Sequence, residues 1–446
     1  MVDQVIDEYQ DATGIDAGAS TNERAAGATT AKYYDGGTTV TPSVTGGATT
    51  VVGDYTYHVF TSGTVNYVTD TTQDLDFLVV AGGGSGGFGE SGGGGAGGLI
   101  YRTEKSVANG TYSVTVGAGG GTGDPGNSGA DSTFGSLFTA KGGGYGGYYS
   151  GPVAAASGGS GGGADHNGDT TFGTSTQAGQ SGDSGTYGFG FAGGRGDTGS
   201  SHGNAQGSGG GGGAGGLGGD AGDGTGGGRG GLGKELTLFN RWGTTSANVA
   251  TTGTDGGWFA SGGGGGRYNS PNSTGTASAG GGSAGTHTTT AATDALANTG
   301  GGGGGNGSSS TSYQAEGGSG IVIVRRPTIL QTPGANLTLQ SVETTAESAP
   351  TTADLVMLIE DNEGTATINT DIKAKVSRDG TDFGDSYVTL VDEGNWGTDK
   401  RILVARNIDL TATHDTGTAM KYKIETFNQS AGVKETRIHA TSLAWA

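Results

Sequence analysis

The segment Leu75-Asp-Phe-Leu-Val-Val-Ala-Gly-Gly-Gly84 changes from a strand pattern to a glycine run without a break. Beyond it, from Ala81 to Gly320, lie 86 of the 103 glycines of the chain. Glycine has no side chain with which to fill a core or to perform chemistry. The middle of the chain must therefore act through its backbone and its shape, which argues against an enzyme.

Strand patterns bracket the glycine-rich region on both sides. Alternating or β-branched residues precede it, and a β-branched run follows it directly after Gly320. We therefore expect the region to be an insertion between the first strands and the last strand of one small β domain. The expected strands are Tyr55–Phe60, Val65–Val68, Leu75–Val80, Leu99–Tyr101, Thr111–Val116 and Ile321–Arg325.

Three interpretations compete for the glycine-rich region. Collagen is excluded, because it needs glycine at every third position and abundant proline, and this chain has 7 prolines. Disorder is the usual outcome for such a composition, because ordering each glycine costs about 1–2 kcal/mol of backbone entropy. A lattice of polyglycine helices is the third interpretation. It would pair the backbone amides of neighbouring runs, and we expect this arrangement.

After Pro333 the composition becomes that of an ordinary globular domain. Short strand patterns alternate with turn clusters, which is typical of an antiparallel β-sandwich. The expected strands are Asn336–Val342, Leu355–Ile359, Thr367–Val376, Tyr387–Val391, Ile402–Ala405, Lys421–Phe427 and Lys434–His439. The sequence thus predicts an all-β protein with four parts: a connector or attachment tail (1–47), the glycine-rich domain (48–326), a linker (327–335) and the sandwich (336–446).

The overall composition limits the classes of function. Only 31% of the residues are hydrophobic, and the formal charge of −20 disfavours direct binding to nucleic acid or to an anionic membrane. There is no cysteine, so neither disulfides nor thiolate metal sites are expected, and oligomerisation is the simplest remaining means of stabilisation. The acidic start has no apolar stretch behind it, and Val2, Val5, Ile6 and Tyr9 predict one or two helical turns there.

Five segments of the β framework carry a resemblance to a known family: Tyr57-His-Val-Phe-Thr-Ser-Gly63, Phe77-Leu-Val-Val-Ala-Gly-Gly-Gly84, Gly94-Gly-Ala-Gly-Gly-Leu99, Gly110-Thr-Tyr-Ser-Val-Thr-Val-Gly-Ala-Gly119 and Gly317-Gly-Ser-Gly-Ile-Val-Ile-Val-Arg325. Over residues 50–326 the chain resembles the glycine-rich domain of bacteriophage tail-fibre and adhesin proteins. The resemblance implies a polyglycine sandwich on a β framework, with loops that meet host receptors. The flanking parts resemble virion structural proteins of tailed marine phages.

Aromatic residues that interrupt the glycine runs are the candidate contact residues. Flat rings beside Asn, Asp and Ser are suited to stacking on sugars and to protein contacts, although they could equally pack over the lattice or fill seams between subunits. The candidates are Tyr145, Tyr148, Tyr149, Trp242, Trp258 and Tyr268. Asp379, Asp382 and Asp385 could chelate a hard cation, but a solvated acidic turn is the alternative. No catalytic, cofactor or metal residues are assigned.

The sequence therefore predicts a non-enzymatic virion protein, a tail fibre or adhesin involved in recognition of the host surface. We expect a homotrimer, an N-terminal tail that binds other tail or capsid proteins, and a host glycan or protein as receptor. A capsid-associated fibre or decoration protein and a bacterial surface adhesin are the alternatives; no export signal or anchor is visible for the latter. Localisation on an extracellular virion follows from the same interpretation.

Overall fold

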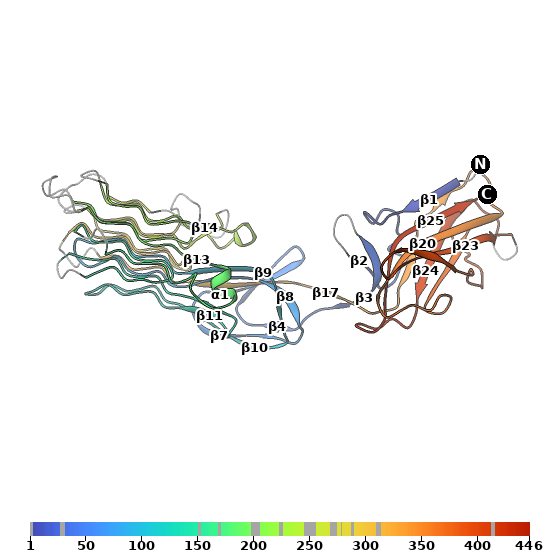
Figure 1. Cartoon of the computed structure of the whole chain (residues 1–446), viewed down its shortest axis with the longest axis horizontal. Coiled ribbons are helices and arrows are strands. Elements are labelled where there is room, and N and C mark those ends of the chain that lie inside the picture. Colours follow the sequence, from blue (N-terminus) through green and yellow to red (C-terminus); the bar gives the residue numbers. More distant parts are fainter. Residues whose placement is uncertain are drawn as a thin grey trace. The chain divides into compact units, whose positions relative to one another are not determined.

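A computed structural model describes residues 3–26, 32–149, 153–167, 171–197, 206–222, 226–244, 256–267, 274–277, 279–286, 290–308, 314–411 and 415–446. The fold is all-β, with antiparallel pairing between the strands of five sheets. The chain forms two compact units, one of Met1–Thr41 with Ile329–Ala446 and one of Pro42–Thr328 (Figure 1). Within the described ranges, no helix is long and apolar enough to cross a membrane.

The first unit is the predicted antiparallel sandwich. Its eight-stranded sheet has the order β17-β3-β25-β20-β23-β22, with β1 paired to β25 and β2 to β3, and its second sheet has the order β18-β24-β19 with β21 paired to β24. The strands are β1 (Asp3–Asp7), β2 (Glu23–Ala26), β3 (Tyr33–Val40), β17 (Leu330–Pro333), β18 (Thr338–Gln340), β19 (Thr344–Thr345), β20 (Thr352–Glu363), β21 (Ile372–Ser377), β22 (Val391–Gly397), β23 (Lys400–Asp409), β24 (Ala419–Thr426) and β25 (Glu435–Trp445).

The core of this sandwich unit lies between its two sheets. Alternate residues of β20, including Met357, and of β24, including Tyr422, are buried in one hydrophobic cluster. Alternation of buried and outward-facing residues along a strand is the pattern of a sheet with one face on a core. The predicted sandwich is therefore present, and both of its sheets contribute to one core.

The outer boundaries of the predicted division differ from the structure. Residues 1–47 were expected to form a separate tail that begins with helical turns, but β1 pairs along its whole length with β25. The predicted linker 327–335 contains β17, which pairs with β3. A polar segment of this kind becomes ordered because partner strands elsewhere in the chain satisfy its backbone groups.

Two predicted strands of the sandwich also shift along the chain. The strand expected at Thr367–Val376 begins only at Ile372, because residues before it form a turn that is hydrogen-bonded to Asp371. The strand expected at Tyr387–Val391 instead begins at Val391 and continues to Gly397. Tyr387 precedes that strand, and its ring lies near the ammonium groups of Lys373 and Lys375.

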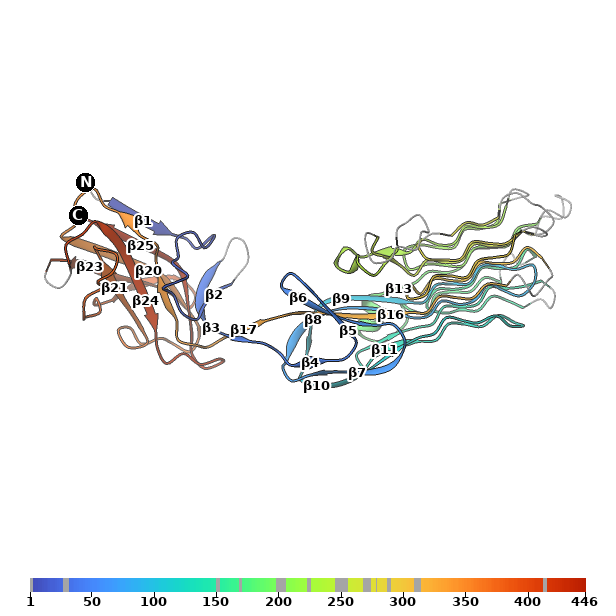
Figure 2. The same cartoon turned by 180° about the vertical axis from the view of Figure 1, so that it is seen from behind.

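The second unit contains a framework of two further sheets (Figure 2). They have the orders β12-β11-β10-β7-β4 and β13-β9-β8-β16-β6-β5, and β14 pairs with β15. The elements are β4 (Val44–Thr45), β5 (Ala48–Val52), β6 (Tyr55–Phe60), β7 (Gly63–Thr69), β8 (Gln73–Val80), β9 (Leu99–Val107), β10 (Gly110–Val116), β11 (Ser132–Phe134), β12 (Phe138–Ala140), α1 (Asp183–Thr186), β13 (Gly188–Phe189), β14 (Lys234–Glu235), the 3-10 turn η1 (Thr237–Phe239), β15 (Trp258–Phe259) and β16 (Ile321–Pro327).

The strand after the glycine-rich region returns to the sheet of the strands before it, as predicted. β16 lies between β6 and β8. One face of β8 and β16 packs on the five-stranded sheet through residues such as Phe77, and the other face packs on Phe239 and Phe259. Burial on both faces explains why these two strands are almost continuously apolar in sequence.

The glycine runs extend side by side from this framework and belong to no helix or strand (Figures 1 and 2). They are buried, and they hydrogen-bond to one another through the backbone with a period of three residues. In the run 92–98, Gly92, Gly95 and Gly98 donate to Gly147, Gly144 and Lys141, Gly93 and Ala96 donate to Gly209 and Gly212, and Gly94 and Gly97 donate to Gly303 and Gly300, at 2.8–3.1 Å.

The carbonyl groups of the same run accept hydrogen bonds from three more segments. These donors are Gly87, Gly84 and Ala81 of one segment, Gly163 and Ser160 of another, and Gly263 of a third. The run 92–98 is thus enclosed by six neighbours, and its buried amides are paired as buried backbone groups require. Hydrogen bonds replace side-chain packing at the centre of this unit.

The spacing of the runs leaves no room for a side chain at Gly211 or Gly263. A Cβ atom on Gly211 would lie 1.9 Å from the carbonyl oxygen of Gly94, and one on Gly263 would lie 2.0 Å from that of Gly303. Both distances are far below van der Waals contact. Glycine at these positions is therefore required by the approach of one backbone to another.

Candidate functional site

Side chains in the glycine-rich unit gather at the turns between runs. Residues 81–87 leave β8 and residues 92–98 lead into β9, so the turn that joins them lies at the end of the runs away from the framework. Gly147 and Gly163 are hydrogen-bonded at the level of Gly92 and Gly93, which places the residues after them at the same end. We call the described residues Phe88–Ser91, Asp124, Tyr148–Tyr149 and Asp165–Asn167 the tip cluster.

Two of the predicted tyrosines lie in the tip cluster with different surroundings. Tyr148 is 7% exposed; its hydroxyl donates to Asp124 Oδ1 at 2.7 Å, and its ring lies edge-on to Phe88 with centroids 5.6 Å apart. Tyr149 is 46% exposed and its ring centroid lies 4.5 Å from that of His166. Tyr148 therefore ties three turns together, whereas the ring of Tyr149 is exposed to solvent.

The ring of Tyr149 lies against a buried histidine, His166. Burial lowers the pKa of His166 to about 4, so its ring is neutral at neutral pH. Its Nε2 lies 3.9 Å from Glu90 Oε2. Burial also raises the pKa of the neighbouring Asp165, against the opposing effect of a backbone hydrogen bond from Asn167. The tip cluster thus combines one exposed ring with polar groups that are largely buried.

The other candidate aromatics do not join this cluster. Tyr145 is half-buried within a run, three residues before Tyr148. Trp242 packs on the framework, with its ring 4.8 Å from that of Tyr57, and Trp258 lies in the short strand that pairs with β14. Tyr268 lies outside the described residues. The structure therefore divides the described candidates between the two ends of the runs.

Sequence reasoning missed the partners of the tyrosines. Phe88, Glu90, Asp124 and His166 lie in short interruptions of the glycine runs, and nothing local indicates that they meet. Their position in the sequence could have indicated these residues, because each follows closely after a run of glycine and therefore belongs to a turn. The pairing of the runs was needed to bring these turns together.

The acidic turn of the sandwich unit is a capped turn. Burial raises the pKa of Asp379, but hydrogen bonds from the N–H groups of Thr381 and Asp382 outweigh it and lower that pKa to about 2. The carboxylate is thus occupied by its own turn. In the described part of the chain, no three His, Asp or Glu side chains are placed to hold a metal ion.

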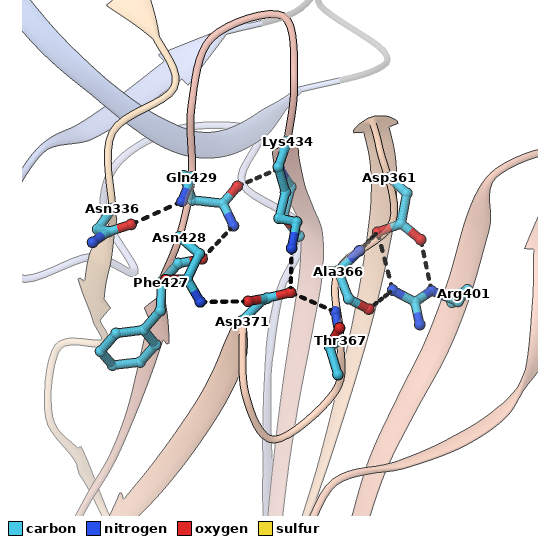
Figure 3. Close-up of polar contacts among 11 residues, drawn as sticks. Asn336, Asp361, Ala366, Thr367, Asp371, Arg401, Phe427, Asn428, Gln429 and Lys434 are labelled. Carbon is cyan, nitrogen blue, oxygen red and sulfur yellow. Dashed lines mark hydrogen bonds and ion pairs between the residues drawn. The ribbon is translucent and has the colours of Figure 1, made fainter.

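A second charged cluster lies in the sandwich unit (Figure 3). Asp371 accepts hydrogen bonds from Lys434 Nζ at 2.6 Å, Asn428 Nδ2 at 2.7 Å and the N–H of Thr367 at 2.8 Å. Burial alone would raise the pKa of Asp371, but these bonds outweigh it and hold the pKa well below its usual range. Because every oxygen is used, this cluster joins loops and leaves nothing for a ligand.

These features define a class: a β framework that carries a bundle of buried glycine runs with side chains at the turns. The comparison with known families agrees with this description, because residues 59–327 match the model of a glycine-rich domain. The chain therefore belongs to the family of proteins with this glycine-rich domain. No curated protein and no solved structure matches the chain.

Proposed function

We propose that this chain is a non-enzymatic virion structural protein, a tail fibre or adhesin that recognises a host surface. One observation carries the proposal: the glycine runs are held together by backbone hydrogen bonds, and they carry an exposed ring, Tyr149, at the end away from the framework. A stiff backbone scaffold with a few polar and aromatic groups at its turns is suited to presenting a contact surface. The receptor would be a glycan or a protein.

We propose further that the glycine runs are polyglycine helices. Such helices are extended, have three residues per turn and pair through backbone hydrogen bonds. The three-residue period of donation in the run 92–98 supports this assignment, and so does the close approach at Gly211. The lattice would make the tip cluster rigid, which lowers the entropy cost of binding.

The sandwich unit would supply the attachment to the particle and the contacts of a homotrimer. We assign this role to the whole unit and not to a free N-terminal tail, because the N-terminal strand β1 is part of the eight-stranded sheet. The partners would be tail or capsid proteins. Its position on the virion would distinguish a tail fibre from the alternative of a capsid decoration protein. Location of the chain in bacterial membranes would indicate the other alternative, a surface adhesin.

Electron microscopy with gold-labelled antibodies against the full-length chain tests location. Label at the tail supports the proposal, whereas label on the capsid or on uninfected cells supports one of the alternatives. Light scattering of the purified chain tests the trimer. Reducing-sugar release from host polysaccharide would contradict the non-enzymatic assignment.

Binding of the labelled full-length chain to the bacteria on which such particles grow tests the tip cluster. We expect Tyr149→Ala to weaken binding at least tenfold, because it removes the exposed ring. Leu217→Ala is the matched control, since Leu217 is 65% exposed but lies at a turn next to the framework end. Equal loss in both variants, or no loss with Tyr149→Ala, would overturn the assignment of the contact surface.

A further inference from the structure

A polar cleft of about 440 Å³ opens beside the framework of the glycine-rich unit, apart from the tip cluster. It lies between β9, the turn from β11 to β12, and the segment around α1. Its lining includes Lys105, Leu137, Thr139, Gln180, Asp183 and Ser184. Its volume is in the range of small-molecule sites, and hydroxyl, amide and charged groups dominate its wall.

Hydrogen bonds hold the wall of the cleft in place. Gln177 is fully buried; its side-chain amide donates to the carbonyl oxygen of Ser184 at 2.8 Å and to that of Thr139 at 3.3 Å, and its Oε1 accepts from Lys141 N. Ser184 Oγ in turn accepts from the N–H of Thr139 at 3.0 Å. The segment that carries Gln180 and Asp183 is thus fastened to β12, and the cleft exists before any ligand binds.

A charged cluster of two cations and one carboxylate lies at the cleft, with Lys105 and Asp183 on the lining and Arg102 beside them. Asp183 Oδ2 lies 2.7 Å from Lys105 Nζ and 3.8 Å from Arg102 Nε, so one carboxylate faces two cations. The guanidinium of Arg102 lies over the ring of Tyr187 at 4.5 Å, and its Nε is buried and has no hydrogen-bond partner among the described residues. The cluster of Lys105, Arg102 and Asp183 therefore carries one net positive charge, and of its two cations Lys105 is the one that lines the cleft.

We propose that this cleft binds one acidic sugar unit of a polysaccharide, a uronic acid. The hydroxyls of such a unit match the hydroxyl and amide groups of the wall, and its carboxylate matches the excess charge of Lys105 and Arg102. A neutral sugar would leave this charge without a partner. The proposal rests on the proposed function, because an acidic polysaccharide is a component of a bacterial surface that a fibre can bind at a site apart from its tip cluster.

Saturation-transfer NMR with the full-length chain tests this site, with glucuronic and galacturonic acid as probes and glucose as the neutral comparison. We expect saturation of a uronic acid and not of glucose. Lys105→Met should weaken binding of the acid about tenfold, because it removes a charged partner and keeps the length of the side chain. Lys234→Met, which changes a lysine that does not line the cleft, is the control.

Absence of binding for both acids, equal binding of glucose, or unchanged binding by Lys105→Met would overturn the proposal. Gln180→Ala provides a second variant if Lys105→Met fails to fold, and it should also weaken binding. Cell binding by the full-length chain separates the two proposals. If cells are bound but no uronic acid is, the cleft assignment fails and the function stands; if neither is bound, both fail.

Discussion

The sandwich unit and the glycine runs of the other unit fill their interiors by opposite means. In the sandwich unit, side chains such as Met357 and Tyr422 occupy the space between two sheets. In the glycine-rich unit, the backbones themselves approach so closely that a methyl group on Gly211 would collide with Gly94. The first interior is stabilised mainly by removal of apolar surface from water, and the second by complete pairing of buried amides. The two interiors should therefore respond differently to a change of volume.

Addition of one methyl group to a glycine run should have the largest effect. Gly211→Ala would place Cβ 1.9 Å from the Gly94 oxygen, and a clash with backbone cannot be relieved by a rotamer change. We expect a loss of more than about 3 kcal/mol, which prevents folding of the glycine-rich unit. Calorimetry would show loss of its transition while that of the sandwich unit remains.

Gly216→Ala is the control within the same unit. The nearest atom to a Cβ there is the nitrogen of Leu232 at 3.9 Å, and the change should alter stability by less than about 0.5 kcal/mol. If Gly211→Ala unfolds at the temperature of the unsubstituted chain, the backbone interior described above is wrong.

Removal of side-chain volume from the sandwich core should have the next largest effect. Met357→Ala deletes a fully buried side chain, and we expect a loss of about 2–5 kcal/mol from the transfer and cavity terms. The transition of the glycine-rich unit should not move. Val433→Ala, at a 68% exposed position, is the control; destabilisation of both units by Met357→Ala would contradict their separate interiors.

Acid should weaken the glycine-rich unit through two buried histidines. Burial lowers the pKa of His58, with a further lowering from Arg326, whose Nε donates to His58 Nε2 at 3.1 Å, and against the opposing effect of its hydrogen bond to Gly46 O. Burial likewise lowers the pKa of His166 to about 4. Both rings bind fewer protons folded than unfolded, so their contribution is complete above about pH 6.5 and is lost as the pH falls below it.

The slope should reach about 1.4 kcal/mol per pH unit for each histidine. Melting temperatures measured from pH 7 to 4.5 would test this, with the slope as the readout. We expect His166→Gln and His58→Gln each to flatten the dependence. Arg326 stays charged and Tyr67 stays uncharged over this range, so an unchanged slope in both variants would contradict the roles of both histidines.

The smallest effect should come from the tip cluster. Tyr148→Phe removes the hydroxyl that donates to Asp124, and we expect a loss of about 1 kcal/mol. Tyr149→Phe, at the exposed neighbour, should change stability by less than about 0.5 kcal/mol. Chemical denaturation can measure both, and a reversal of the order would show that Tyr148 does not tie the turns together.

Local pattern was sufficient to predict the strands with apolar residues. The run from Leu75 to Val80 and the run from Ile321 to Arg325 both become strands, since burial on two faces leaves a strong signal in sequence. The N-terminal strand could not be predicted in the same way. It is polar, and its partner β25 lies at the other end of the chain, so only the tertiary pairing reveals it.

The candidate site was predictable only in part for a related reason. Interrupting aromatics indicated turns, and Tyr148 and Tyr149 do lie in one. Their partners Asp124 and His166 depend on which runs become neighbours. Glycine runs are nearly identical in sequence, so nothing in one run specifies which other run it will pair with.

The pairing of the run 92–98 also sets an order for folding. Gly93 donates to Gly209, and Gly94 to Gly303, so the centre of the unit joins segments that are made at very different times. Contacts between residues this distant in sequence form only after long loops have closed. The entropy cost of closing these loops comes before the stabilising contacts form, which slows folding. We expect the unit to remain open during synthesis and to assemble in one late step, when the ribosome has released the chain beyond β16.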